Sequence, residues 1–327
     1  MSPEGVASNG VAARNGLGPA RMVEIQRARL IAAMVEVSAE RGMGNATVAH
    51  VVERAGVSRR TFYELFIDRE DCFLAAFDEA ITRASRYVLD SYDPDARWAE
   101  RIRTALIGLL SFLDAERGAG QLLIVWSLGA GASSLERRRL LLAQVIAAVD
   151  EGRGGSKTGD EPPPLTAEGV VGGALSVLHS RLLEEQPGQL VELTGPLMSM
   201  ILLPYLGARA ARKEIARPAP EGSACKVGSV AHDPLRELDM RLTYRTVRVL
   251  TAVAAHPGGS NRQVADGSGI ADQGQISKLL ARLHGLGLVE NTGAGSVRGA
   301  PNAWTLTAKG WEVETAITRD TVAVEES

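Results

Sequence analysis

Cysteine, lysine, aromatic side chains and long apolar runs are all scarce in this chain of 327 residues. Two cysteines, Cys72 and Cys225, are too few for a disulfide framework in a chain of this length. The longest apolar runs reach about ten residues, whereas a membrane-spanning helix needs about 20. No basic start followed by an apolar segment marks the chain for secretion. We therefore expect a cytoplasmic protein, with no membrane partner.

The chain also lacks an excess of either charge. Its 36 basic and 39 acidic residues give a formal net charge of −3, which excludes a histone-like polycation. Only five of the basic residues are lysines. Nucleic-acid binding must therefore come from a local patch. Because 45% of the residues are apolar, the chain can bury a sizeable core, and its length favours about two domains.

Composition and periodicity divide the chain into five segments. Residues 1–21 have no apolar period and are expected to form a loose tail, whereas 22–67 and 68–206 are helical, 207–232 is a Gly/Pro-rich linker and 233–327 is a separate domain. The expected helices up to the linker are 22–41, 48–55, 59–66, 69–91, 95–117, 120–130, 133–151, 166–185 and 188–206. After it we expect a helix over 234–255, two shorter helices, strands Leu288–Thr292 and Ala303–Thr307, and a final helix Ala308–Thr318.

One short helix presents chemistry suited to DNA. Spacing of three and four residues turns one set of side chains inward (Phe62, Leu65, Phe66) and another outward (Arg59, Arg60, Tyr63). A guanidinium can contact guanine O6 and N7 in the major groove, and hydroxyl groups can hold phosphates. Gly56 supplies the residue that a tight helix junction needs. Three residues stand where N-caps are wanted: Thr47, Ser58 and Asp68.

Residues 30–77 resemble the DNA-binding domain of the tetracycline-repressor (TetR) family. The matching features are AERG at the end of the first helix, Thr47 opening the second, ERAGVS at the turn, then T-x-Y-x-x-F and RED. The resemblance implies that Arg59, Arg60 and Thr61 lie near bases, while Thr47, Ser58, Tyr63 and Arg69 hold phosphates. Many relatives have Lys-Gly where this chain has Arg59-Arg60, so the operator sequence does not carry over. The alternative is that Arg59 and Arg60 are solvated surface charges without a role in binding.

A second candidate interface lies in the last domain. The stripe of Ile276, Leu279, Leu280 and Leu283 leaves polar residues outward on the same helix (Gln273, Gln275, Ser277, Lys278), and Arg298 falls between the two expected strands. The order of three helices and two strands resembles the winged-helix domains of MarR-type regulators. This implies base and phosphate contacts by those residues. A protein-interaction or dimerisation module is the alternative.

The TetR resemblance implies that the middle of the chain binds a ligand and dimerises. The helices at 166–185 and 188–206 would pack against a second copy as a four-helix bundle, and the small residues from Gly169 onward allow close approach. The candidate ligand contacts are Leu122, Trp126, His179 and Met198. An ordinary monomer core is the alternative for both sets.

These features predict a mainly α protein: a TetR-like helix-turn-helix, a helical ligand and dimerisation domain, and a winged helix. We expect a homodimeric repressor that binds double-stranded operator DNA at the nucleoid and is released by an unidentified small molecule. A ligand-independent regulator or activator is the alternative within this class. Enzyme and scaffold functions are the alternatives outside it, but the chain lacks the G-x-S-x-G, P-loop and H-E-x-x-H motifs, and its histidines and cysteines do not cluster. We expect no catalytic residue, no metal and no cofactor.

Overall fold

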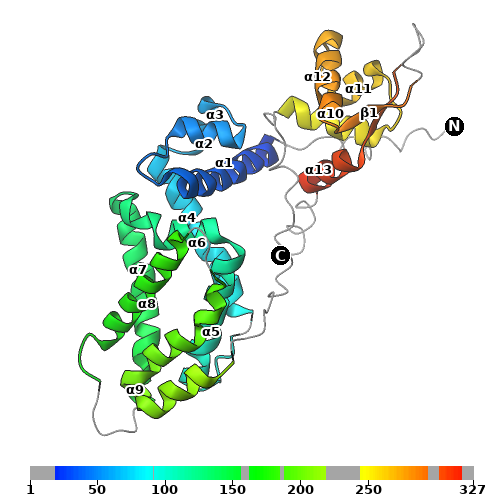
Figure 1. Cartoon of the computed structure of the whole chain (residues 1–327). Helices are drawn as coiled ribbons and strands as arrows, with labels where there is room; N and C mark the ends of the chain where they lie inside the picture. The colour runs from blue at the N-terminus through cyan, green and yellow to red at the C-terminus, as the bar shows by residue number, and fades with distance from the viewer. Residues whose placement is uncertain are drawn as a thin grey trace, which may run out of the picture. The chain divides into compact units, whose positions relative to one another are not determined.

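The computed structural model describes residues 19–90, 92–155, 162–184, 188–218, 244–293 and 302–318 (Figure 1). These residues are mainly helical and fall into two compact units. Unit 1 comprises the described residues up to Leu30, Val52–Leu65 and the C-terminal region 244–318. Unit 2 comprises Ile31–Val51 and the described residues from Phe66 to 218.

Four helices open the described chain and agree closely with the expected ranges. They are α1 (Pro19–Arg41), α2 (Val48–Ala55), α3 (Arg59–Leu65) and α4 (Arg69–Leu89). Each of the three expected caps is confirmed, because a side-chain oxygen accepts from a backbone N–H three residues later. The pairs are Thr47 Oγ1 with His50 N at 3.3 Å, Ser58 Oγ with Thr61 N at 3.0 Å, and Asp68 Oδ1 with Asp71 N at 2.9 Å.

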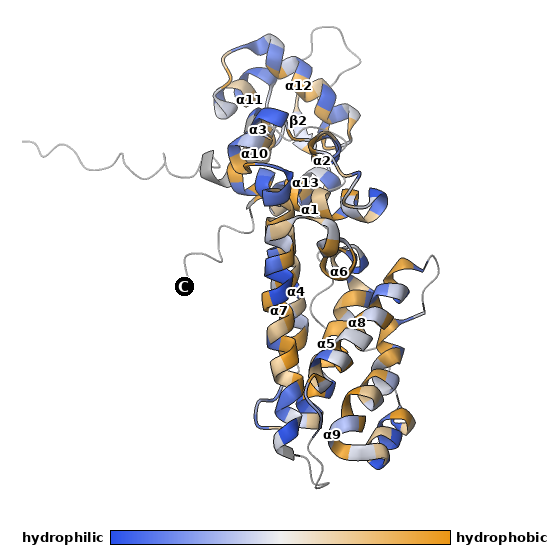
Figure 2. Cartoon of the chain, turned by 90° about the vertical axis from the view of Figure 1, so that its left-hand side faces the viewer, coloured by the Kyte–Doolittle hydropathy of each residue, from blue (hydrophilic) through white to orange (hydrophobic). Residues whose placement is uncertain are grey.

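Unit 2 continues as a helical domain after α4. Its helices are α5 (Trp98–Ala115), α6 (Arg117–Ile124), α7 (Ala132–Asp150), α8 (Thr166–Leu183) and α9 (Thr194–Ala216), with 3₁₀ turns η1 (Trp126–Gly129), η2 (Glu151–Gly155) and η3 (Leu190–Leu193). Polar and apolar residues alternate along these helices in Figure 2, as expected for amphipathic helices around a shared core.

Helices α4 and α5 are in close contact at a glycine. A Cβ on Gly108 would lie 2.5 Å from the carbonyl oxygen of Tyr87 and 2.7 Å from the Cα of Val88. Only a hydrogen fits this position, so the two backbones touch directly. The ring of Tyr87 packs edge-on against Phe112 beside the crossing, with 5.7 Å between ring centroids.

Helix α9 corrects two expected boundaries. Expected to end at 206, it continues to Ala216, ten residues into the expected linker 207–232. The helix is interrupted at Gly207, which has the non-helical angles φ 78° and ψ 175°, and resumes after it. By length and composition alone, Leu190–Ala216 could cross a membrane. Half of its most apolar stretch is buried inside the protein, however, as in a core helix.

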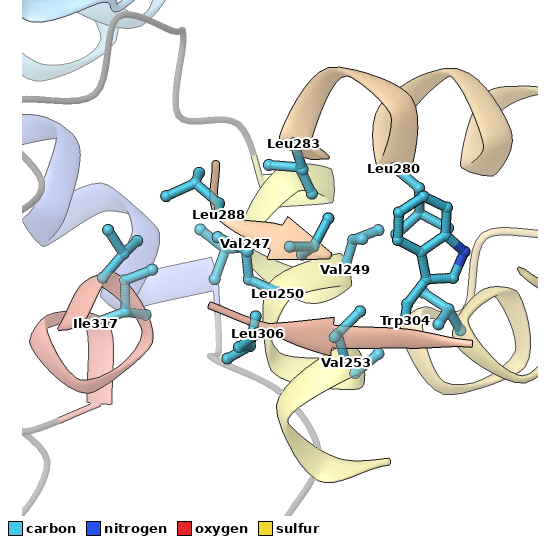
Figure 3. Packing of buried hydrophobic residues seen from close by; sticks show 14 of the residues in the cluster. Val247, Val249, Leu250, Val253, Leu280, Leu283, Leu288, Trp304, Leu306 and Ile317 are labelled. Carbon is cyan, nitrogen blue, oxygen red and sulfur yellow. The ribbon is translucent and has the colours of Figure 1, made fainter. Parts of the chain in front are cut away.

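The C-terminal region contains the expected helices and strands. They are α10 (Tyr244–Ala255), α11 (Asn261–Ser268), α12 (Gln273–Gly285), β1 (Val289–Asn291), β2 (Trp304–Leu306) and α13 (Ala308–Thr318). The strands are antiparallel, with Val289 opposite Leu306 and Asn291 opposite Trp304. Figure 3 shows side chains from these elements, including Val249, Leu280 and Ile317, converging on one hydrophobic cluster. The expected start of the first of these helices, 234–243, lies outside the described residues.

The expected domain boundary after residue 67 differs from the division that packing makes. Helices α1 and α2 each contribute to both units, and α3 falls in unit 1. The cause is visible in the cluster of the C-terminal region, which includes Met22 and Ile25 of α1. Sequence periodicity predicts which residues are buried, but it does not predict which other element of the chain they pack against.

Candidate nucleic-acid interface

The junction between α2 and α3 is a tight turn closed by backbone hydrogen bonds. Gly56 N donates to Glu53 O and Val57 N donates to Val52 O, both at 3.1 Å. Gly56 has φ 62°, a left-handed conformation that other residues adopt at a cost. The side chain of Val57 is buried, which fixes the direction in which the chain enters α3. The segment is a helix-turn-helix.

Helix α3 separates its apolar and polar side chains as the spacing predicts. Phe62 is fully buried and Phe66 nearly so, whereas Tyr63 is 59% exposed and Arg59 is exposed. The side chain of Arg60 is 89% exposed. Two guanidinium groups and a phenol therefore project from one short helix.

Arg60 already has a carboxylate partner on its own helix. Its Nε donates to Glu64 Oε1 at 2.8 Å, and this hydrogen bond, with the opposite charge, raises the pKa of the arginine above its ordinary value. The pair is exposed to solvent, so it contributes little to stability. A base or phosphate can replace the carboxylate.

Capping residues flank this exposed helix. Ser58 Oγ also lies 2.9 Å from Thr61 Oγ1, so the two hydroxyl groups share a hydrogen bond at the start of α3. Both side chains are half-buried, whereas Thr47 at the start of α2 is exposed. Backbone N–H groups at a helix start attract anions, which suits a phosphate.

Arg69, expected at a phosphate, is engaged within the protein. Its Nη1 donates to Ala46 O at 2.8 Å and to Met43 O at 3.2 Å, so the guanidinium ties the α1–α2 turn to the start of α4. The residue is half-buried. Its contact with phosphate stays a prediction, and the geometry gives it a positioning role.

The comparison with protein families decides what this helix-turn-helix belongs to. Residues 30–76 match the family model described as bacterial regulatory proteins, tetR family. The helix-turn-helix segment is therefore similar to the DNA-binding segment of the TetR family. The matched family is one of regulatory proteins and not of enzymes, in agreement with the expectation that the chain is not an enzyme. The match ends at residue 76, so the C-terminal region lies outside it.

Three solved structures resemble this chain at low identity. The fatty acid degradation regulator FadR from Bacillus halodurans is 20% identical, covering 57% of this chain and 96% of its own, with a TM-score of 0.48. A TetR-like regulator from Rhodococcus sp. RHA1 is 19% identical, with 54% and 94% covered and a TM-score of 0.45. FadR from Bacillus subtilis, in complex with stearoyl-CoA, is 18% identical, with 53% and 96% covered and a TM-score of 0.47. The comparison with curated proteins returns no match.

The second expected interface lies on α12, outside the TetR-family match. Its four candidate residues are all exposed: Gln273, Gln275, Ser277 and Lys278. In the expected stripe behind them Ile276, Leu280 and Leu283 have no exposure, whereas Leu279 is half-buried. Arg298 lies outside the described residues.

A network of amides joins α12 to the strands. Asn261, at the start of α11, donates to Ser277 Oγ at 3.0 Å. Its side-chain oxygen accepts from Trp304 Nε1 at 2.6 Å and from Asn302 Nδ2 at 3.1 Å. Asn302 in turn accepts from Asn291 Nδ2 at 2.8 Å. One side chain thus positions α12 relative to the hairpin.

The four expected ligand contacts occupy different environments. Leu122 and Met198 are fully buried, whereas Trp126 and His179 are half-buried. The indole of Trp126 lies against Gly42, where an added Cβ would be 3.4 Å from its Cζ3. Its Nε1 is buried without a hydrogen-bond partner among the described residues. A shared ligand contact by all four stays a prediction. No group of three or more metal-ligating side chains forms within the described ranges.

Sequence reasoning missed three residues that shape the two surfaces. Glu64 was visible as an acidic residue four positions after Arg60. Arg245, whose Nη1 donates to Gln275 Oε1 at 3.0 Å, lies 30 residues from its partner. Asn261 is separated from Trp304 by 43 residues. No local pattern announces contacts over such separations.

Proposed function

We propose that this chain is a homodimeric TetR-family repressor that reads an operator through α3 and is released by a small molecule. The observation that carries the proposal is the face of α3, where Arg59, Arg60 and Tyr63 project from a helix that is capped and backed by Phe62. A helix of this kind fits the major groove, where arginine is bidentate to guanine.

In this mechanism bases and phosphates are held by different groups. Arg59, Arg60 and Thr61 contact base edges, while Thr47, Ser58 and Tyr63 hold phosphates on either side. Arg69 holds the α1–α2 turn in place from behind. Two copies related by a twofold axis would read two half-sites about 34–36 Å apart.

The dimer contact is proposed on α8 and α9. A Cβ added to Gly169 or Gly172 would meet nothing within 4 Å, so the α8 backbone is open to a close neighbour there. Leu183 and Leu203 add exposed apolar surface, which a second copy would cover. Leu197 and Ile201, also on α9, are buried within the protomer at 3% and 6% exposure and are not available to a second copy. Leu203 is therefore the residue to test.

Release of the operator by the effector would depend on a movement of α4. Glu70 Oε1 accepts from Ser133 N at 3.2 Å, and Asp78 Oδ2 accepts from Arg137 Nη2 at 2.9 Å, so α4 is joined to α7 at two levels. We propose that an effector with a hydrogen-bond acceptor binds beside Trp126, whose Nε1 is buried and unpaired in the described structure. Such a ligand shifts the population toward a half-site separation that no longer fits the operator.

A second candidate function concerns the C-terminal region: a winged helix that contacts DNA beside the operator. The exposed polar face of α12 and its link to the hairpin through Asn261 favour it. A regulator with two reading surfaces could equally activate transcription, and a protein partner on α12 is the competing reading.

Genome-wide mapping of bound sites, followed by binding of the full chain to the recovered operator, tests the main proposal. We expect a palindromic site, two chains per operator and a specific affinity well above that for unrelated DNA. Binding without any sequence preference would refute an operator-specific repressor. Screening small molecules for release of the complex then tests the effector.

A further inference from the structure

The first three turns of α1 carry a buried stripe that precedes the TetR-family segment. Met22, Ile25 and Arg29 follow an i, i+3, i+7 spacing and are 5%, 6% and 7% exposed. Val23, on another face, is 46% exposed, so burial follows one side of the helix. The family match begins only at residue 30. The stripe therefore lies in an extension of the helix that the matched DNA-binding segment does not include.

The partner of this stripe is the C-terminal region. Met22 and Ile25 belong to the hydrophobic cluster whose other members come from α10 to α13 and the two strands, more than 200 residues later in the sequence. Val247, Val313 and Ile317 in that cluster have no exposure. In Figure 3 the ribbon of α1 passes beside Ile317 and α13. Two large side chains of α1 thus complete this core.

We infer that residues 19–29 are a docking helix by which the C-terminal region attaches to the DNA-binding domain. Helix α1 runs without a break from this stripe to Arg41, so a single helix carries both the docking stripe and the start of the family-matched segment. The C-terminal region is therefore held by two connections, the chain after α9 and the packing against α1.

The docking helix has a consequence for regulation, which rests on the proposed operator binding. A helix that is ordered in advance loses less conformational freedom when DNA binds, so docking strengthens operator binding. By linkage, any partner that pulls the C-terminal region off α1 weakens operator binding, and operator DNA opposes that partner. The C-terminal region then senses a signal that is separate from the effector beside Trp126.

Hydrogen–deuterium exchange of the full chain tests the docking. The double variant Met22→Ala/Ile25→Ala removes both side-chain contacts, and alanine itself favours helix, so α1 should still form. Val23→Ala, on the exposed face, is the matched control. We expect amides of α10 and α13 to exchange at least threefold faster in the double variant and unchanged in the control. Unchanged exchange in α5 and α8 shows that the rest of the chain remains folded. Ile25→Val, which removes a single methylene, should give a smaller effect of the same kind.

Equal protection of α10 and α13 in all four proteins would overturn the docking helix. Operator affinity of the same proteins tests the coupling, with at least a threefold loss expected for the double variant and none for Val23→Ala. Faster exchange with unchanged affinity would overturn the coupling and leave the docking in place. An unaltered protein that binds no operator would refute the proposed function, while the exchange result would still stand.

Discussion

The guanidinium of Arg103 and the carboxylate of Glu214 form an ion pair between α5 and α9, with Nη1 2.6 Å from Oε2 and side chains 5% and 10% exposed. Arg103 Nη2 also donates to Pro218 O at 3.3 Å, so one arginine holds the end of α9. A buried pair of this kind is strongly destabilising when only one partner is removed, because the other charge stays desolvated.

Arg103→Met should therefore lower the free energy of unfolding by about 3–5 kcal/mol. The double variant Arg103→Met/Glu214→Leu should recover most of that loss, since neither charge is left buried. Arg137→Ala, which breaks the exposed pair with Asp78, is the control and should cost below about 1 kcal/mol. Urea denaturation followed by circular dichroism measures all three. A double variant as unstable as the single one would contradict this account.

Arg60→Ala should weaken binding to the mapped operator by about 1–3 kcal/mol, because a bidentate contact with guanine is lost. Tyr63→Phe should weaken binding on operator and unrelated DNA alike, as a phosphate contact does. Arg139→Ala, which removes another exposed arginine from α7, is the control. Fluorescence anisotropy with both DNAs separates the two effects. Unchanged operator affinity for Arg60→Ala would remove α3 from the groove.

Glu64→Gln should tighten binding several-fold on every DNA sequence. The substitution removes the carboxylate that holds Arg60 Nε at 2.8 Å and also removes a negative charge facing phosphates. Glu136→Gln, which breaks the corresponding pair with Arg139 on α7, is the matched control. Titrations at several salt concentrations measure the change. Weaker binding by Glu64→Gln would show that the carboxylate orients Arg60 in the complex.

Leu203→Glu should convert the dimer into monomers, because a charge at the proposed contact would be buried without a partner. Leu203 is 51% exposed in the protomer, so the variant can fold, unlike a charge at the buried Leu197. Leu140→Glu, on the exposed face of α7, is the control. Sedimentation velocity distinguishes the outcomes. A dimer of Leu203→Glu would place the contact elsewhere.

Lys278→Ala should make the slope of log K against log salt shallower by about one unit if α12 contacts a phosphate. Lys309→Ala removes the same charge from an exposed position on a different helix, α13, and should leave the slope unchanged. The full chain serves for every measurement. Equal slopes for the parent and both variants would favour a protein partner on α12.

The sequence predicted the α3 face because every contact that defines it is local. A period of 3.6 residues places Phe62 inside and Arg60 outside, and the cap of Ser58 on Thr61 spans three residues. The same reasoning placed both strands to within one residue at either end. The break between α6 and η1 was missed, since the run around Leu122 and Trp126 has no glycine or proline to mark it.

Contacts between distant residues were beyond such reasoning. Arg103 and Glu214 lie 111 residues apart, and either could have been a solvated surface charge. Arg69 has the composition of a phosphate ligand, yet its guanidinium is positioned against two carbonyl oxygens of a turn that precedes it by more than 20 residues. Met22 and Ile25 were correctly read as part of a helix, but their partner is in another domain of the sequence.

Gly108 makes the crossing of α4 and α5 a point about which α4 can tilt. Because the α5 backbone rests directly on the carbonyl of Tyr87, with no compressible side chain between them, α4 pivots at this point more easily than it slides. Arg69 lies 18 residues away, about 27 Å along the helix, so a tilt of about 5° moves it by roughly 2 Å. A side chain at position 108 would separate the backbones of α4 and α5 at this crossing. In the proposed mechanism, α4 would then lose the fixed axis about which it tilts, even if every DNA contact remained in place.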